Sequence, residues 1–463
     1  MSTTRRTLGI FSIAMITAGS VDSIRNLPAT ALFGSSVIFF FGLAALLFLL
    51  PCALVAAELG STTPDDRGVY SWVKNAFGLR AGFLAIWFQW VENLFWYPTI
   101  LSFIAGTIGF LISPQLAHNQ YYLMTVILVA FWGMTILNLF GMKSSANFAN
   151  FCSLAGLILP MCLIIALGVA WIAEGHPIQT SFHFDDMLPH PNSGMWVALT
   201  GIILSYCGME IACVHSGEVK DPQTNYPKAM LLATILIFFT LLFGSLAIAI
   251  VLPQQQISLV AGIMQAFSAF FSAYHLVWIL PLIALMLVIG GLGGVNNWLI
   301  APTRGLQIAM RDGSFAKIWH AQNKFGAPYA LLIVQGIIAS IVSSAFLLMP
   351  SVNGAYWLLT ALASILYMLM YLYMFAAGIK LRYVKNLGRK KGFMIPGGNW
   401  GMWIVGITGL IGSLGGLIIG FVPPSNINIG SVWHYEMLLI FGSLIMSVPP
   451  FFMHVVAKKR MKK

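Results

Sequence analysis

Two places deep inside apolar stretches of this sequence have charged side chains close to glycine and serine residues. Asp22 and Arg25 lie three residues apart in A-G-S-V-D-S-I-R-N-L-P, and Glu210 ends the run L-S-Y-C-G-M-E. A buried charge costs several kcal/mol unless it is paired, faces a cavity, or both. Opposite charges in such a place can hold the charged groups of a small solute. A permanent Asp22–Arg25 pair that only braces the protein is one alternative, and an Arg25 that snorkels to the membrane surface is another.

The residues around these charges favour an opened backbone. Irregular backbone is tolerated at bilayer depth only where it lines a cavity enclosed by protein. We therefore expect breaks near residues 18–23 and 206–210 to face each other. Their free N–H and C=O groups would hold the amine and the carboxylate of a zwitterion. Besides the charged residues, the candidate binding positions at the breaks are Ala18, Gly19, Ser20, Ser205, Tyr206, Cys207 and Gly208.

Three carboxyl groups in apolar surroundings are candidates for proton coupling. Burial disfavours the charged form of a carboxyl group, so Glu210 is expected to take up a proton under transport conditions. Asp22 is a second candidate. Glu92, which lies between Trp90 and Trp96, is a third, with simple burial against a polar neighbour as its alternative.

Three aromatic residues complete the candidate binding set. Tyr367 and Tyr371 are one helical turn apart and so share a helix face. Trp298 follows the glycine-rich run V-I-G-G-L-G-G-V-N-N. For all three, packing with a satisfied polar atom is the alternative interpretation.

The composition places these residues in a membrane. The 463 residues are 59% apolar and 8% charged, with a mean hydropathy of +0.86. Soluble domains of this size do not have that balance, so we expect an all-α polytopic membrane protein. Twelve spans fit the apolar pattern, at residues 10–33, 36–58, 81–112, 121–140, 149–173, 195–216, 229–252, 276–300, 327–349, 353–379, 399–422 and 434–457.

The basic residues orient these spans. Of the 24 lysines and arginines, all except Arg25 fall in segments on one side of the membrane. The positive-inside rule makes that side the cytoplasm and places both termini there, as in a bacterial inner-membrane protein. Glu58 is expected at the inner edge as an interfacial residue. The net charge of +11 is thus an orientation signal and does not indicate nucleic-acid binding. The five cysteines have no metal-ligand spacing, and no cofactor is expected.

The two breaks fall in the first and sixth spans. Interrupted helices at corresponding positions of two halves are typical of secondary transporters, and an odd number of spans per half inverts the second half. We expect a first five-helix repeat over residues 1–174 and a second, inverted repeat over 193–384. Residues 385–463 would hold spans eleven and twelve and a short basic cytoplasmic tail. Val69–Phe77 is predicted to be a short amphipathic helix at the inner face.

Five motifs are specific enough to compare with known families. They are I-L-S-Y-C-G-M-E in span six, V-K-D-P-Q-T-N-Y-P-K-A-M-L-L after it, A-G-I-M-Q-A-F after span seven, N-W-L-I-A-P-T-R-G-L after span eight and F-M-I-P-G-G before span eleven. With them the chain resembles the amino acid–polyamine–organocation (APC) transporter superfamily, and within it the bacterial glutamate/GABA antiporter family. The resemblance implies a five-plus-five inverted repeat of the LeuT type with unwound first and sixth helices. It also implies amino acid exchange by alternating access.

The resemblance further implies roles for single residues. Glu210 matches the functional glutamate of span six in that family. Tyr367 and Tyr371 are similar to its substrate-gating tyrosines of span ten. Trp298 matches a tryptophan at the end of span eight.

Three positions depart from the antiporter pattern. Arg25 stands in place of a tyrosine, Asp22 in place of an apolar residue and Gly294 in place of a glutamate. We expect Arg25 to select a substrate with a side-chain carboxylate, because a guanidinium can bind a carboxylate through two parallel hydrogen bonds. In the empty protein Asp22 would be its partner.

The sequence as a whole predicts a secondary amino acid transporter rather than an enzyme, exchanging substrates of the glutamate/GABA type. Proton-coupled uptake is the alternative mechanism. A membrane receptor that binds an amino acid without moving it is the alternative from another class. The expected partners are an amino acid and the lipid bilayer, with protons and a second copy of the chain, as a homodimer, as further candidates.

Overall fold

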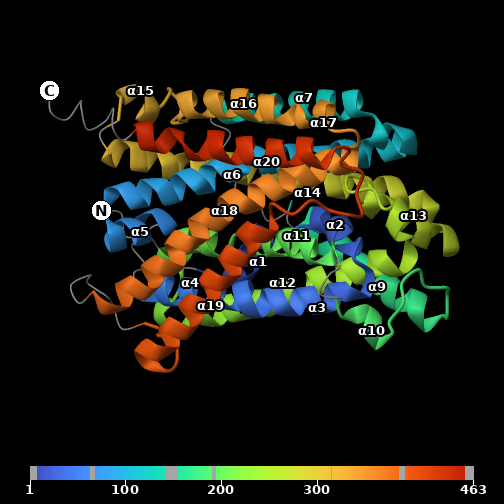
Figure 1. Cartoon of the computed structure of the whole chain (residues 1–463), viewed down its shortest axis with the longest axis horizontal. Coiled ribbons are helices and arrows are strands. Elements are labelled where there is room, and N and C mark those ends of the chain that lie inside the picture. Colours follow the sequence, from blue (N-terminus) through green and yellow to red (C-terminus); the bar gives the residue numbers. More distant parts are fainter. Residues whose placement is uncertain are drawn as a thin grey trace.

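The computed structural model describes residues 8–62, 68–140, 152, 154–189, 194–313, 315–384 and 392–453. Within these ranges the chain is helical, apart from loops and one isolated bridge between Leu8 and Val219. The helices form an elongated bundle (Figure 1). They are α1 (Ile10–Val21), α2 (Leu27–Ala31), α3 (Val37–Ala44), α4 (Leu50–Thr62), α5 (Val69–Phe77), α6 (Leu79–Ile112), α7 (Gln120–Leu139), α9 (Leu159–Ala173), α10 (Phe184–Met187), α11 (Ala198–Ser205), α12 (Pro222–Val251), α13 (Gly262–Ala273), α14 (Leu280–Asp312), α15 (Lys317–His320), α16 (Tyr329–Ser343), α17 (Ala345–Leu348), α18 (Val352–Tyr383), α19 (Gly398–Ile419) and α20 (Val432–Ser447).

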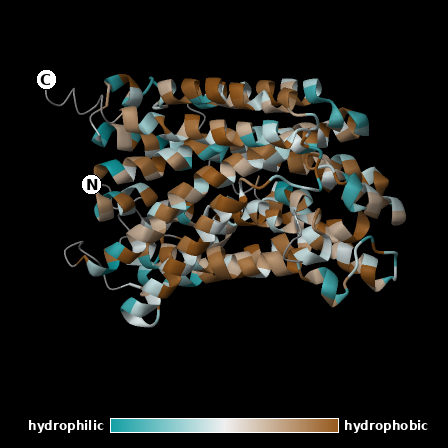
Figure 2. Ribbon diagram, in the orientation of Figure 1, coloured by the Kyte–Doolittle hydropathy of each residue, from teal (hydrophilic) through white to brown (hydrophobic). Residues whose placement is uncertain are grey.

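The membrane-spanning character of the bundle agrees with the sequence. Eleven helical segments among the described residues are long and apolar enough to cross a bilayer. Each corresponds to one of the predicted spans from the second to the twelfth. The first predicted span is divided into α1, the 3-10 turn η1 (Ile24–Asn26) and α2. Figure 2 shows hydrophobic residues along the length of the helices and hydrophilic residues gathered at the two ends of the bundle. The all-α membrane fold is confirmed; the total of twelve spans and the inverted repeat remain predictions.

The connecting helices sort to the two ends of the bundle. Helices α5 and α15 lie at one end, and α10 and α13 lie at the other (Figure 1). The sequence places the first pair on the inner side and the second pair on the outer side, so the alternation of the loops agrees with the charge pattern. The predicted helix Val69–Phe77 is confirmed with those bounds as α5.

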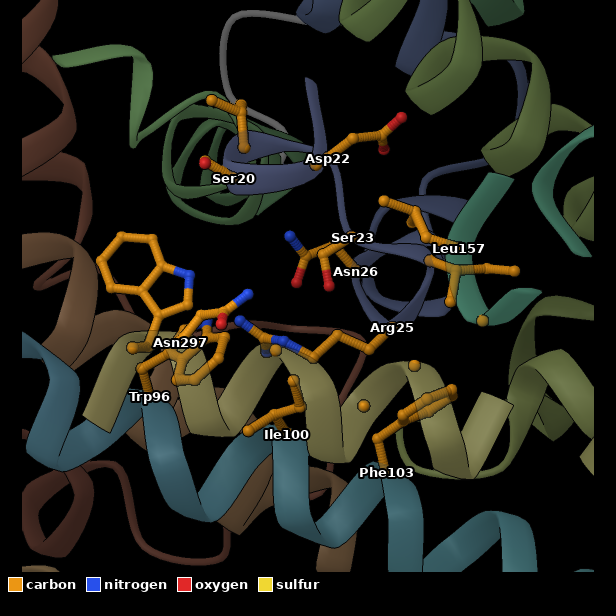
Figure 3. Close-up of a pocket in the computed structure, with 18 of the residues that line it drawn as sticks. Ser20, Asp22, Ser23, Arg25, Asn26, Trp96, Ile100, Phe103, Leu157 and Asn297 are labelled. Carbon is orange, nitrogen blue, oxygen red and sulfur yellow. The ribbon is translucent and has the colours of Figure 1, made fainter. Parts of the chain in front are cut away.

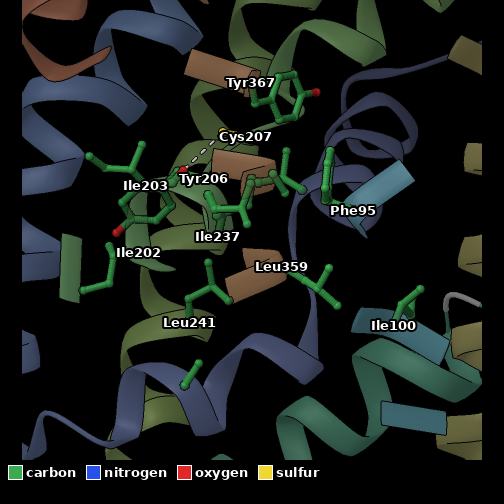
Figure 4. Packing of buried hydrophobic residues seen from close by; sticks show 14 of the residues in the cluster. Phe95, Ile100, Ile202, Ile203, Tyr206, Cys207, Ile237, Leu241, Leu359 and Tyr367 are labelled. Atoms are coloured by element: carbon green, nitrogen blue, oxygen red, sulfur yellow. Dashed lines mark hydrogen bonds between the residues drawn. The ribbon is translucent and has the colours of Figure 1, made fainter. Parts of the chain in front are cut away.

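Both predicted breaks are present. Helix α1 ends at Val21, and the next two residues, Asp22 and Ser23, have extended backbone with ψ of 133° and 113°. Helix α11 ends at Ser205, and Gly208 takes a left-handed conformation with φ of 110° before the 3-10 segment η7 (Met209–Glu218). The long helix α6 packs against two other long helices, α14 and α18. Apolar side chains of α6, α11, α12 and α18 fill the surroundings of the breaks (Figure 4).

Candidate functional site

The two helix breaks face each other, as the sequence predicts. A Cβ atom on Gly208 would lie only 3.1 Å from the carbonyl oxygen of Ser20. Two features therefore require glycine at this position. A side chain would crowd the Ser20 carbonyl group, and residues other than glycine rarely adopt a φ of 110°. Since α1 ends at Val21, its last carbonyl groups lack intrahelical partners. The breaks therefore bring free backbone acceptors against the start of η7.

A central cavity of about 120 Å³ lies beside the breaks. It is enclosed by the first break, α6, the π-helical turn η5 (Leu154–Ile158), the end of α11, α14 and α18. Figure 3 shows side chains from the first break, α6, η5 and α14 around it. Eight of the predicted site residues line the cavity: Gly19, Ser20, Asp22, Arg25, Glu92, Cys207, Trp298 and Tyr367.

Arg25 is the cation of this cavity and is only 2% exposed. Its Nη1 donates to Thr99 Oγ1 at 2.8 Å and to the Tyr356 hydroxyl at 3.1 Å. The guanidinium also lies over the Trp96 ring, 5.2 Å from its centroid. Its Nε is buried without a hydrogen-bond partner. All of these partners are neutral, so the charge of Arg25 is not compensated by an ion pair within the described ranges.

The expected Asp22–Arg25 pair does not form, and that prediction is wrong. The Asp22 carboxylate accepts a hydrogen bond from Thr240 on α12 at 2.7 Å through Oδ2, while its Oδ1 is buried without a partner. In Figure 3 the two side chains point in different directions from the break. The physical reason is the extended backbone at Asp22 and Ser23, because residues three apart share a face only within a continuous helix.

The acidic group that does share the cavity with Arg25 on a neighbouring helix is Glu92 of α6. It is 2% exposed, and its Oε1 accepts from Asn93 Nδ2 at 2.8 Å. Its Oε2 is buried without a partner. The cavity therefore contains a guanidinium and a carboxylate that each retain an unused hydrogen-bonding atom.

Glu210 accepts hydrogen bonds from three side chains that come from two other helices. Tyr367 donates to its Oε1 at 2.7 Å, Tyr371 to its Oε2 at 2.6 Å and Gln89 Nε2 to its Oε1 at 2.9 Å. The Tyr371 hydroxyl in turn accepts from the Gly208 backbone N–H at 2.7 Å. Glu210 thus connects the second break to α6 and α18.

Glu210 also belongs to the wall between two cavities. A second cavity, of about 320 Å³, lies between α5, α6, η7 and α14 and is lined by Glu210 and Gln89. We call it the inner cavity because the sequence predicts that α5 lies at the cytoplasmic face. Tyr367, one of the donors to Glu210, lines the central cavity. At the inner cavity, Asp312 accepts from Lys74 at 2.6 Å and from the Tyr70 hydroxyl at 2.9 Å. Burial and the Asp312 carboxylate raise the pKa of Tyr70, which keeps this phenol a hydrogen-bond donor.

Comparison with known proteins identifies the family to which the chain belongs. Residues 8–443 match the amino acid permease family, which is most of the chain. The chain belongs to that family. The permease is 43% identical to an uncharacterized transporter from Legionella pneumophila over 448 residues, covering 97% of this chain and 96% of the relative. It is 29% identical over 462 residues to a glutamate/γ-aminobutyrate antiporter from Lactococcus lactis, covering 98% of this chain and 92% of the relative. The resemblance to the APC superfamily is thereby confirmed.

A solved structure supports the fold of the permease. The crystal structure of a manganese transporter from Eremococcus coleocola matches with a TM-score of 0.59 over 99% of both chains. At 13% sequence identity, this likeness bears on the fold alone. The relatives are transporters, and the permease is accordingly a multi-pass membrane protein that handles a small molecule.

Six predicted residues lie near the central cavity of the permease without lining it. Tyr206 is fully buried, and its hydroxyl donates to the Phe41 carbonyl at 3.3 Å, away from the cavity. Ser205 donates to the Gly201 carbonyl at 2.7 Å within its own helix. The other four are Ala18, Gly208, Glu210 and Tyr371.

Glu58 is not interfacial in the permease, so that prediction is wrong. Its side chain is fully buried and forms an ion pair with Arg382 at the end of α18. The Glu58 Oε2 also accepts from the Ile395 N–H at 2.9 Å, and Arg382 Nη2 donates to the Gly398 carbonyl at 2.9 Å. Because a membrane helix end can be covered by protein as well as by water, a charge near the edge of a span does not by itself indicate exposure.

The sequence analysis did not identify the neutral partners of Arg25, although their helical spacing from identified site residues could have indicated them. Thr99 lies seven residues after Glu92, two helical turns along the same helix. Tyr356 lies eleven residues before Tyr367, about three turns along α18. Both spacings place the missed residue on the helix face of a residue that was identified.

Proposed function

We propose that this permease is an amino acid antiporter of the glutamate/GABA type, which exchanges substrates by alternating access at the central cavity. It would lie in the bacterial inner membrane with both termini in the cytoplasm. Support comes from the antiporter relative at 29% identity and from the facing helix breaks. The observation that carries the proposal is Arg25, a buried guanidinium in the cavity whose partners are neutral.

An arginine in this position favours a substrate with a carboxylate. Uncompensated charge at bilayer depth is costly, and a substrate carboxylate would neutralise it on binding. The planar guanidinium can form two parallel hydrogen bonds with a carboxylate, and its Nε has no hydrogen-bond partner. The free backbone groups of the two breaks would hold the remaining polar groups of the substrate.

Counterflow in proteoliposomes tests this function. Vesicles loaded with unlabelled glutamate or GABA should accumulate radiolabelled glutamate, and empty vesicles should not. A panel of neutral, basic and acidic amino acids as internal substrates would define the substrate class. Accumulation that needs internal lysine or arginine instead of an acidic substrate or GABA would contradict the proposal.

Proton-coupled uptake is a second candidate, favoured by the position of Glu210. This carboxyl group lines the inner cavity and is hydrogen-bonded to a tyrosine of the central cavity. A proton bound there could move with the substrate. Empty vesicles with an imposed proton gradient distinguish the two mechanisms, because a symporter accumulates substrate in them and an obligate exchanger does not. Saturable binding without any vesicle flux would point to a receptor instead.

A further inference from the structure

The central cavity contains unused hydrogen-bond acceptors as well as an unused donor. Glu92 and Asn93, neighbours on α6, both line it and are 2% and 0% exposed. Oε2 of Glu92 and Oδ1 of Asn93 are buried without a hydrogen-bond partner. A carboxyl oxygen and an amide oxygen on neighbouring residues are acceptors suited to an ammonium group, which only donates.

The orientation of the Asn93 amide follows from its neighbours. Its Nδ2 donates to the Gln89 carbonyl at 2.7 Å and to Glu92 Oε1 at 2.8 Å. Both partners are acceptors, so the nitrogen must point toward them and the oxygen must point away. The hydrogen bond to Oε1 also fixes the Glu92 carboxyl group. The two free oxygens are thus held in place by their own helix.

Opposite charges in this cavity remain separate. Arg25 binds neutral groups, and no ion pair of the described residues joins it to Glu92 or Asp22. The Asp22 carboxylate is held by Thr240 on α12. A buried guanidinium and a buried carboxyl group without ion-pair partners are each costly to charge, and a ligand with complementary charges would stabilise the charged form of both at once.

We infer that Glu92, assisted by Asn93, binds the ammonium group of the substrate while Arg25 binds its distal carboxylate. The cavity then selects substrates by the spacing between these two charges. This inference rests on the proposed function and adds the group that recognises the amine.

The chemistry of the proposed substrates fits such a site. In glutamate and in GABA the same chain of carbon atoms separates the nitrogen from the distal carboxyl group, and glutamate has the α-carboxylate in addition. A site that reads only the shared part accepts both exchange partners. The α-carboxylate of glutamate would be left to the backbone groups of the breaks.

Ligands that lack one charged group test the assignment on the purified protein. Glutarate is glutamate with a hydrogen atom in place of the ammonium group, and butylamine is GABA with a methyl group in place of the carboxylate. We expect Glu92→Gln to weaken the binding of glutamate, GABA and butylamine about tenfold or more, because a hydrogen-bonded charge pair is lost. Glutarate should bind equally well or better, since the carboxylate that repels it is gone. The readout is the half-saturating concentration for ligand-induced thermal stabilisation.

Asp22→Asn is the matched control, since it also neutralises an acidic residue at the cavity. It should change the affinities of all four ligands by a similar factor. An ammonium-selective loss in Asp22→Asn would assign the amine to Asp22 and overturn the inference. If Glu92→Gln weakens the binding of glutarate and glutamate equally, the effect is structural. If it weakens the binding of neither, Glu92 does not bind the ammonium group. Either result also overturns the inference.

A shorter carboxylate gives an independent test if Glu92→Gln does not fold. Glu92→Asp withdraws the acceptor by one methylene group, so its preference should move from GABA toward the longer δ-aminovalerate. An unchanged preference along the series β-alanine, GABA and δ-aminovalerate would count against a site that reads charge spacing. Failure of the proposed function would look different. Neither glutamate nor GABA would then stabilise the wild-type protein or support counterflow.

Discussion

Arg25 is a buried guanidinium with neutral hydrogen-bond partners, and this makes its role testable by a conservative change. Lysine keeps the charge but cannot form two parallel hydrogen bonds with a carboxylate. We expect Arg25→Lys to weaken acidic substrates about tenfold or more while neutral amino acids change only a few-fold. The thermal stability should stay close to that of the wild type. Competition against counterflow by a panel of amino acids measures both affinities.

Asp22→Asn is the companion to this change. Because Asp22 bonds to Thr240 and not to Arg25, its substitution should not reproduce the loss of acidic substrates. If Arg25→Lys weakens every substrate equally or unfolds the protein, Arg25 only braces the first break, and its selection of a carboxylate is refuted.

The role of Glu210 can be tested separately. Its carboxyl group accepts hydrogen bonds from side chains of α6 and α18. Replacement by glutamine removes the ionisable group but retains one acceptor oxygen for the tyrosines. If Glu210 carries a coupled proton, Glu210→Gln should flatten the pH dependence of transport in a folded protein. The pH profile of counterflow is the measurement. An unchanged profile would shift proton coupling to another carboxyl group, with Glu92 the next candidate.

Sequence alone identified the buried charges at and beside the two breaks, but not the partners of Arg25 and Asp22. Composition is sufficient to show that Arg25, Glu92 and Glu210 lie at bilayer depth, because the surrounding residues are apolar. Composition does not predict the direction in which each side chain points. The extended residues Asp22 and Ser23 redirect the chain, so the helical spacing rule does not apply between Asp22 and Arg25.

At the scale of the elements, the close contact between the two broken helices depends on one glycine. Gly208 has a φ of 110°, and a Cβ atom added to it would lie 3.1 Å from the Ser20 carbonyl oxygen. A left-handed conformation costs an L-residue about 1–2 kcal/mol, and the added methyl group would also push the two breaks apart. We expect Gly208→Ala to abolish substrate binding while the protein still folds. Ligand-induced stabilisation and the melting temperature of the free protein together measure this.

A second glycine substitution controls for the change of residue type. Gly133 lies within α7, and a Cβ there would contact nothing within 4 Å. Alanine at such a helical position is favoured by about 0.5–1 kcal/mol, so Gly133→Ala should bind substrate normally. If Gly208→Ala binds as well as Gly133→Ala does, the close approach of the breaks is not needed for the site.

The breaks themselves were predictable because local residue types determine them. Glycine and serine next to buried charge signal an opened helix wherever a bilayer surrounds it. The short helix α5 was predictable for a similar reason, since its aromatic and basic residues suit an interface. The composition of the cavity wall was not, because it depends on how α6, α14 and α18 rotate about their axes against the breaks. That rotation is set by packing between distant segments.

At the scale of the whole molecule, one buried ion pair holds three elements together near the end of the bundle where α5 lies. Glu58 of α4 pairs with Arg382 of α18, and both contact the segment that leads into α19. A second pair near the same end, Lys74–Asp312, is partly exposed, with side-chain exposures of 38% and 26%. The two pairs have the same charges but different surroundings, so they should differ in their contribution to stability.

Glu58→Gln removes one charge and leaves Arg382 buried without compensation. Such a change costs about 3–5 kcal/mol, whereas breaking an exposed pair costs about 0–1 kcal/mol. We therefore expect Glu58→Gln to lower the melting temperature strongly in detergent, and Lys74→Gln to lower it little. The double variant with Glu58→Gln and Arg382→Gln should lose less than the sum of its single changes, because the second substitution removes the charge that the first leaves unpaired. Equal melting of Glu58→Gln and Lys74→Gln would show that Arg382 finds water or another partner, and that this pair does not hold α4 and α18 together.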